Sequence, residues 1–255
     1  MSDARLRQLE RAYAESGALA DERALLHARL QAGALEREAL ALAAYCGSAV
    51  ALELGGPLEP APPTVEDWFS ARGWGEGLLR WGQAVPTRAV LAILTPVLAS
   101  LPEREPSRLY GDGLVESALR PRLLDLLAEL EAWALEPCAR TQRRVRRSAR
   151  DLAGPAERFA EVLTAARAAH RDPWAQLTAR ERELGRLEDV LRRCARAVSD
   201  TVANRRGQHA GVIVSGALFL PRGGLAEGQA LATGELIAWA LGHGDPLRDR
   251  VEARG

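Results

Sequence analysis

The sequence predicts an all-α protein in which helical hairpins, similar in size to helical repeats, pack on a larger helical bundle. Apolar residues recur at helical spacing along most of the 255 residues, and glycines or prolines stand where these segments would end. The hydrophobic content of 47% is sufficient to form a core without disulfides or a structural metal. We expect about ten helices and little or no sheet.

Residues 1–56 are predicted to form the N-terminal helical hairpins. Gly17, Gly33 and Gly47 each follow an apolar-periodic segment, at the position where glycine commonly ends a helix. Two helices in about 30 residues is the size of a helical-repeat unit, although no named repeat motif recurs.

Residues 57–113 are predicted to connect the two parts through short helices. Four prolines and two glycines between residues 55 and 64 prevent a helix there, and we expect Thr64 to cap the next one. Three tryptophans then lie close together in the sequence: Trp68, Trp74 and Trp81. They indicate either an aromatic plug that joins the helical halves or an exposed partner-binding patch. A further helix opens at Pro86 and is bent by Pro96.

Residues 114–255 are predicted to form the C-terminal bundle. The leucine-rich segment 114–135 has a wide apolar face, and we expect Pro121 to break or start its helix near Arg120. The segment 140–153 predicts a further helix. The last helix is expected over 226–241, with Gly242, Gly244 and Pro246 ending it.

Two segments of this bundle leave alternatives open. Apolar residues over 177–198 form a helical stripe that either packs inside the bundle or forms a coiled-coil homodimer. Residues 212–220 suit a strand or a buried helix equally well. The segment 177–184 resembles the start of the helix-turn-helix of LuxR-type response regulators, but the turn and second helix of that motif are missing.

The charged residues are balanced overall but divided along the chain. All 34 basic residues are arginines, and they balance 34 acidic residues. The use of arginine in place of lysine is typical of a protein from a GC-rich bacterial genome, and it excludes any mechanism that needs a lysine. Residues 1–136 carry 13 arginines and 20 acidic residues, a net charge of −7, whereas residues 137–255 have a net charge of +7. An arginine face recurs at helical spacing in the second half: Arg140, Arg143, Arg144 and Arg147.

This arginine face has three interpretations. It can pair with the acidic half of the chain, beginning with the upstream Glu129, Glu131 and Glu136, or contact an acidic partner protein. It can also bind nucleic acid, which we do not expect because the chain is neutral overall and no aromatic residues interleave with these arginines.

The sequence contains no recognisable catalytic, cofactor or metal motif. The three cysteines are widely spaced, and the four histidines are isolated and form no zinc or metalloprotease pattern. We therefore predict no cofactor and no metal. The longest apolar stretch is about 13 residues, shorter than a membrane span, and no signal peptide is recognisable. We expect a cytoplasmic protein that is not embedded in a membrane.

Three segments, 40–47 (LALAAYCG), 131–138 (EAWALEPC) and 237–246 (IAWALGHGDP), resemble a group of uncharacterised helical proteins of myxobacteria and planctomycetes. Some of that group resemble putative immunity-protein helical domains. The resemblance implies an all-helical protein without known catalytic residues and assigns no site.

These observations predict a non-catalytic protein-interaction protein with an adaptor, regulatory or immunity-like role. Its partner is expected to be another protein with an acidic or apolar surface. The candidate partner surface is the arginine face together with Trp68, Trp74 and Trp81. The alternatives are a nucleic-acid-binding protein that uses the basic helix Arg140–Arg150, or an enzyme whose site the sequence does not reveal.

Overall fold

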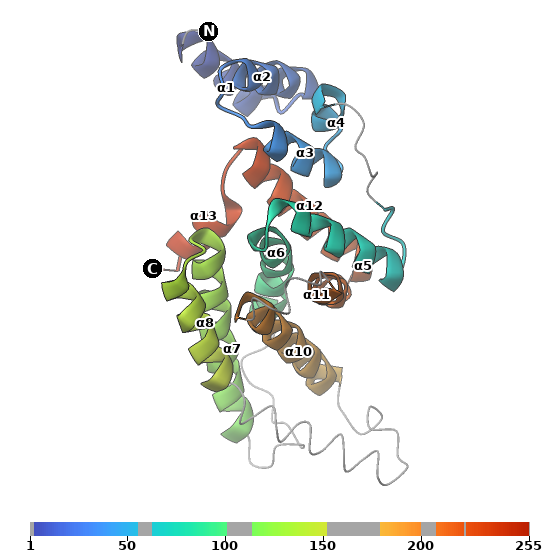
Figure 1. Ribbon diagram of the computed structural model, residues 1–255, viewed down its shortest axis with the longest axis vertical. Helices are drawn as coiled ribbons and strands as arrows, with labels where there is room; N and C mark the ends of the chain where they lie inside the picture. Colours follow the sequence, from blue (N-terminus) through green and yellow to red (C-terminus); the bar gives the residue numbers. More distant parts are fainter. Residues whose placement is uncertain are drawn as a thin grey trace.

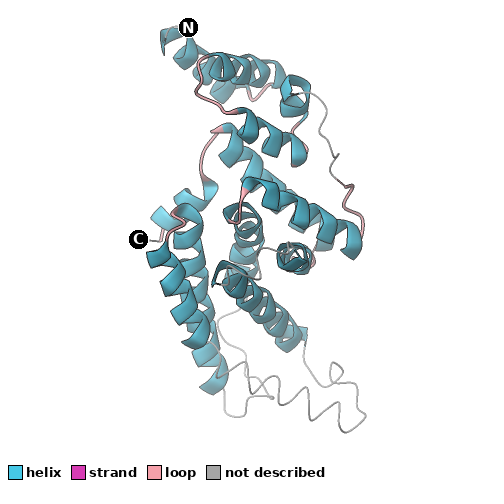
Figure 2. Cartoon of the chain, viewed as in Figure 1, coloured by secondary structure: helices cyan, strands magenta, loops and turns pink. Residues whose placement is uncertain are grey.

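The computed structural model describes residues 3–55, 63–100, 114–151, 179–199, 208–221 and 223–254. Within these ranges the chain forms twelve α-helices and one 3-10 helix, and no strand is present (Figure 2). The all-α prediction is therefore confirmed. No helix among the described residues is both long enough and apolar enough to cross a membrane.

Four short helices form the N-terminal end of the molecule (Figure 1). They are α1 (Asp3–Ser16), α2 (Leu19–Gln31), α3 (Arg37–Tyr45) and α4 (Ala49–Gly55). Three glycines separate them in the left-handed conformation, with φ of 60° at Gly17, 67° at Gly33 and 96° at Gly47, as the sequence predicted.

The region between residues 57 and 113 contributes α5 (Trp68–Gly77), η1 (Leu78–Trp81) and α6 (Ala84–Ser100). Asp67, not Thr64, caps α5: its carboxylate accepts the Ser70 backbone N–H at 2.8 Å, while the Ser70 hydroxyl accepts the Asp67 N–H at 2.9 Å. Every residue from Val85 to Leu94 is buried. This region therefore supplies a central core helix, α6, and is more than the predicted connection.

Six helices complete the bundle around α6: α7 (Leu114–Leu135), α8 (Ala139–Asp151), α10 (Ala179–Ser199), α11 (Gln208–Leu218), α12 (Gly224–Leu241) and α13 (Pro246–Glu252). The predicted break at Pro121 is wrong, because α7 continues through it. Proline removes a single backbone donor, and the leucines that follow bury the apolar face of α7: Leu123, Leu126, Leu127 and Leu130.

Helices α10 and α11 bear on the alternatives left open in the second half. Residues 212–218 are helical, within α11. Helix α10 is uninterrupted, so the helix-turn-helix is absent from its described length; residues 177 and 178 lie outside the described ranges. The described part of the 177–198 stripe is buried against the chain's own helices: Leu187, Leu191, Cys194 and Val198. This arrangement favours the bundle over a coiled-coil dimer.

Helix α13 was not expected, because Pro246 was predicted to end the chain's last helix. Asp245 instead caps a new helix by accepting the Arg248 backbone N–H, and Pro246 occupies the first turn. Proline is well suited to that position, where its missing N–H has no intrahelical partner.

Two glycines let α5 and α11 cross closely. A Cβ atom on Gly75 would lie 2.7 Å from the Val214 Cβ, and one on Gly211 would lie 2.6 Å from the Arg72 carbonyl oxygen. Larger residues would force the helices apart. The close crossing fixes the relative position of the N-terminal end of α5 and the C-terminal end of α11.

Candidate partner-binding surface

An exposed aromatic patch lies where α5 begins and α11 ends. It consists of Trp68, Phe69 and Phe219, which are 41%, 80% and 40% exposed. The rings of Trp68 and Phe219 lie 6.0 Å apart, and Phe69 is the next residue of α5. The capping box of Asp67 and Ser70 fixes the first turn that carries the two α5 aromatics. We call these three residues the aromatic patch.

The three tryptophans do not share one role: the sequence left open an exposed partner-binding patch or a buried aromatic plug, and both occur. Trp68 belongs to the aromatic patch, whereas Trp74 is 2% exposed and stacks on Tyr45 with ring centroids 6.3 Å apart. Trp81 is half-buried, and its indole N–H donates to the Glu38 carbonyl at 3.0 Å. Trp74 therefore does not belong on the partner surface, because the chain's own side chains cover it. Both Trp74 and Trp81 act as the aromatic plug.

Tyr45 connects this plug to α3. Its hydroxyl donates to the Trp74 carbonyl at 2.9 Å, and burial raises the Tyr45 pKa to about 12. Gly77 makes room for the ring, since a Cβ there would lie 2.0 Å from the Tyr45 hydroxyl oxygen. The N-terminal helices and the bundle thus share one apolar core.

The arginine face lies on the solvent side of α8. Its four residues, Arg140, Arg143, Arg144 and Arg147, are all exposed, while Thr141 and Val145 point into the protein. Arg144 Nε lies 2.7 Å from Glu129 Oε2 on α7. Of the three upstream glutamates, Glu129 makes the predicted contact with α8, but Glu131 is buried and pairs with Arg254.

A buried ion network joins α6 to α12 and α13. Arg88, 3% exposed, donates to both carboxylate oxygens of Asp245 at 2.8 and 3.1 Å, and its Nη1 lies 3.5 Å from Glu235. Arg250 donates to the other Glu235 oxygen at 2.7 Å. The Arg88 guanidinium also lies 4.3 Å from the centre of the Trp239 ring. Each buried charge therefore has an opposite charge beside it, as a structural network requires.

The charge on Asp245 is stabilised by this network. Burial opposes ionisation, but the hydrogen bonds and positive charge of Arg88 outweigh it, so the pKa of Asp245 lies below its ordinary value. A second buried carboxylate, Glu131, accepts two hydrogen bonds from Arg254 and one from Thr95. No local sequence pattern indicates these contacts, since Arg88 and Asp245, for example, are 157 residues apart.

The histidines and cysteines occupy separate places. His243 Nε2 lies 3.0 Å from Glu22, so it joins the end of α12 to α2, whereas His27 is exposed. Cys46 and Cys194 are buried, and Cys138 is exposed. His170 and the side chain of His209 lie outside what the structure describes. Among the residues with described positions, no cluster of histidine, cysteine and acidic side chains is arranged to hold a metal ion.

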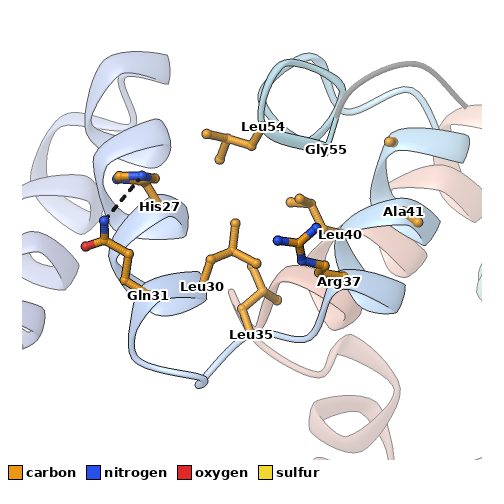
Figure 3. A pocket seen from close by; sticks show the side chains of 10 residues that line it. His27, Leu30, Gln31, Leu35, Arg37, Leu40, Ala41, Leu54 and Gly55 are labelled. Carbon is orange, nitrogen blue, oxygen red and sulfur yellow. Dashed lines mark hydrogen bonds between the residues drawn. The ribbon is translucent and has the colours of Figure 1, made fainter.

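A cavity of about 450 Å³ opens between α2, α3 and α4 (Figure 3). Its lining is leucine-rich, with polar side chains at the rim, and comprises His27, Leu30, Gln31, Leu35, Arg37, Leu40, Ala41, Ala44, Leu54 and Gly55. No local sequence pattern indicates this cavity, because its walls come from three helices and the loop between α2 and α3. Phe69 and Phe219 were likewise not predicted as part of the partner surface, although Phe69 stands beside Trp68 in the sequence.

A scan against protein-family models and comparisons with curated proteins and with solved structures found no match for the chain.

Proposed function

We propose that this protein is a non-catalytic interaction protein that binds another protein through the aromatic patch. The observation that carries the proposal is the exposure of Trp68, Phe69 and Phe219 on one end of the α5–α11 pair. Tryptophan and phenylalanine are enriched in the cores of protein interfaces, where they bury large apolar areas. The arginine face offers a second contact, suited to acidic groups on the partner.

An adaptor, regulatory or immunity-like role in a bacterial cytoplasm is the form of this proposal that we favour. The three sequence segments resemble a group of uncharacterised helical proteins, some of which resemble helical domains of immunity proteins, and this resemblance supports the role. The arginine-only composition supports the bacterial origin. The free thiols of Cys46, Cys138 and Cys194 support a reducing compartment.

The two carboxylates whose pKa shifts are resolved have structural roles, so neither is a candidate for a catalytic acid. The acids whose pKa shifts are resolved in the described structure, Asp67 and Asp245, are both lowered. Hydrogen bonds from Ser70 lower the pKa of Asp67, and Arg88 lowers that of Asp245. Both carboxylates cap helices. A general acid at neutral pH needs the opposite shift.

The test is quantitative affinity capture from the native lysate with matched variants. Phe69→Ser removes the most exposed ring of the patch, and Leu19→Ser is the control, because Leu19 is an exposed leucine on α2. We expect Phe69→Ser to lose the partner captured by the unaltered chain, and Leu19→Ser to retain it. Equal capture by both variants would refute the aromatic patch as the binding surface.

The nucleic-acid alternative is tested on the same protein by fluorescence anisotropy with duplex DNA. Binding through the arginine face would weaken with salt, with a log–log slope near −0.9 for each phosphate contacted. We expect negligible binding at physiological salt. Submicromolar, salt-sensitive binding would establish the alternative in place of our proposal.

A further inference from the structure

We propose that the cavity between α2, α3 and α4 binds a small carboxylate that carries an aliphatic chain. The volume of about 450 Å³ lies within the range of small-molecule sites. The site is separate from the aromatic patch and from the arginine face, so the inference does not depend on the proposed protein partner.

The inner wall of the cavity is apolar. Leu35, Leu40 and Ala44 line it and are buried, and the half-buried Leu30 and Leu54 complete it. In Figure 3 the side chains of Leu30, Leu40 and Leu54 converge from α2, α3 and α4, and Leu35 joins them from the loop between α2 and α3. An aliphatic chain placed among them would leave water and gain the free energy of apolar burial.

The rim of the cavity selects the charge of the ligand. Arg37 lines the cavity and has no hydrogen-bond or ion-pair partner among the described residues, and its guanidinium faces His27 across the opening (Figure 3). None of the ten lining residues is acidic. Among the described lining residues, Arg37 therefore supplies an unpaired positive charge and no residue supplies a negative one, an arrangement that is complementary to a carboxylate.

The residues around Arg37 place its charge toward the cavity. Arg37 is the first residue of α3 and lines the cavity, whereas the neighbouring Glu36 and Glu38 do not line it. On the opposite side, the Gln31 amide donates to His27 Nε2 at 3.5 Å, which leaves its second N–H available to an oxygen ligand.

The experiment compares three ligands with the same ten-carbon chain by isothermal titration calorimetry: decanoate, decan-1-ol and decyltrimethylammonium. We expect decanoate to bind with one site per chain and the other two to bind at least about ten-fold more weakly, because only the carboxylate pairs with Arg37. Decanoate should also shift the backbone amide signals of Ala41 and Gly55 in a ¹H–¹⁵N correlation spectrum.

Two variants and a control locate the site. Arg37→Gln keeps the cavity and should weaken decanoate about ten-fold, whereas Leu54→Trp fills the cavity from a half-buried position and should abolish binding. Arg5→Gln changes an exposed arginine on α1 that lies outside the cavity, and it should bind decanoate like the unaltered chain. Circular dichroism confirms that each variant is folded.

The proposal is overturned if decanoate does not bind, if the three ligands bind equally, or if Arg37→Gln binds decanoate unchanged. Equal binding would indicate an apolar groove without charge selection. Binding that survives in a folded Leu54→Trp variant would place the ligand elsewhere on the chain.

Discussion

Helices α6 and α8 carry the same side chain in opposite surroundings. Arg88 on α6 is buried among two carboxylates and the Trp239 ring, whereas Arg143 and Arg147 on α8 face solvent. In low dielectric an unpaired charge is costly, so Arg88 and its partners depend on one another. In water the same charge is screened. The role of an arginine in this protein therefore follows from its burial, not from its place in an arginine-rich sequence.

The largest effect is expected for Arg88→Leu. Removing Arg88 deprives Asp245 of the two hydrogen bonds from that guanidinium and leaves Glu235 with Arg250 as its described partner. The free energy of unfolding should therefore fall by about 3–5 kcal/mol. Urea denaturation followed by circular dichroism measures this loss. The matched variant on α8, Arg147→Leu, should change stability by less than about 0.5 kcal/mol. Similar losses in the two variants would contradict the comparison.

A smaller effect is expected for Asp245→Asn, and it depends on pH. The pKa of Asp245 is lowered in the folded protein, so its stabilising contribution is complete at neutral pH and is lost as the pH falls through the folded pKa. We expect Asp245→Asn to lose about 1–2 kcal/mol at pH 7 and to lose less stability than the unaltered chain on acidification. Denaturation curves at several acidic pH values measure this, and parallel profiles would contradict it.

On α8 the double variant Arg143→Glu, Arg144→Glu tests the exposed side of the comparison. It breaks the Arg144–Glu129 pair, in which the Arg144 side chain is half exposed, and exposed pairs contribute about 0–1 kcal/mol. The fold should therefore survive. We expect partner capture to fall if the face contacts an acidic partner, and DNA binding to stay negligible. Extensive unfolding would show that the face is needed for folding.

The smallest expected difference is in the chemical reactivity of two thiols, Cys194 beside α6 and Cys138 before α8. Cys194 lies beside Thr87 of α6, and burial raises its pKa. Cys138 is exposed just before α8, and hydrogen bonds from Thr141 lower its pKa. Iodoacetamide should therefore modify Cys138 first in the native protein, with peptide mass spectrometry as the measurement. Equal labelling of both cysteines would show that the core opens readily.

Elements with a local signal were predictable from the sequence. Glycines at positive φ ended the N-terminal helices as expected, and helical spacing identified α12 and most of α7. Where two local signals competed, the prediction was wrong. Thr64 and Asp67 are both capping residues, and the choice fell to Asp67 because Ser70 stands three residues later and completes a reciprocal pair.

The candidate sites were less predictable because they depend on packing between distant segments. The sequence around Trp68 and Trp74 does not show which of them is buried. Trp74 stacks on Tyr45 and is buried, whereas Trp68 lies beside Phe219 at the end of α11 and remains partly exposed. The buried network escaped prediction for the same reason, since Arg88 is one of the few charges in an otherwise apolar stretch and gives no indication of its partners. The arginine face, which is the most prominent charge feature of the sequence, lies on the exposed side of α8.

One contact between the ends of the chain bears on how the protein is made. Arg29 of α2 donates to the carbonyl of Leu241, 212 residues later, where it satisfies a carbonyl at the end of α12. A ribosome adding roughly 5–20 residues per second needs about 10–40 s to synthesise the intervening chain. During that time α3 lacks α12, the bundle helix against which it packs, and Arg29 lacks its carbonyl partner, so the N-terminal helices reach their final packing only after nearly the whole chain has been made.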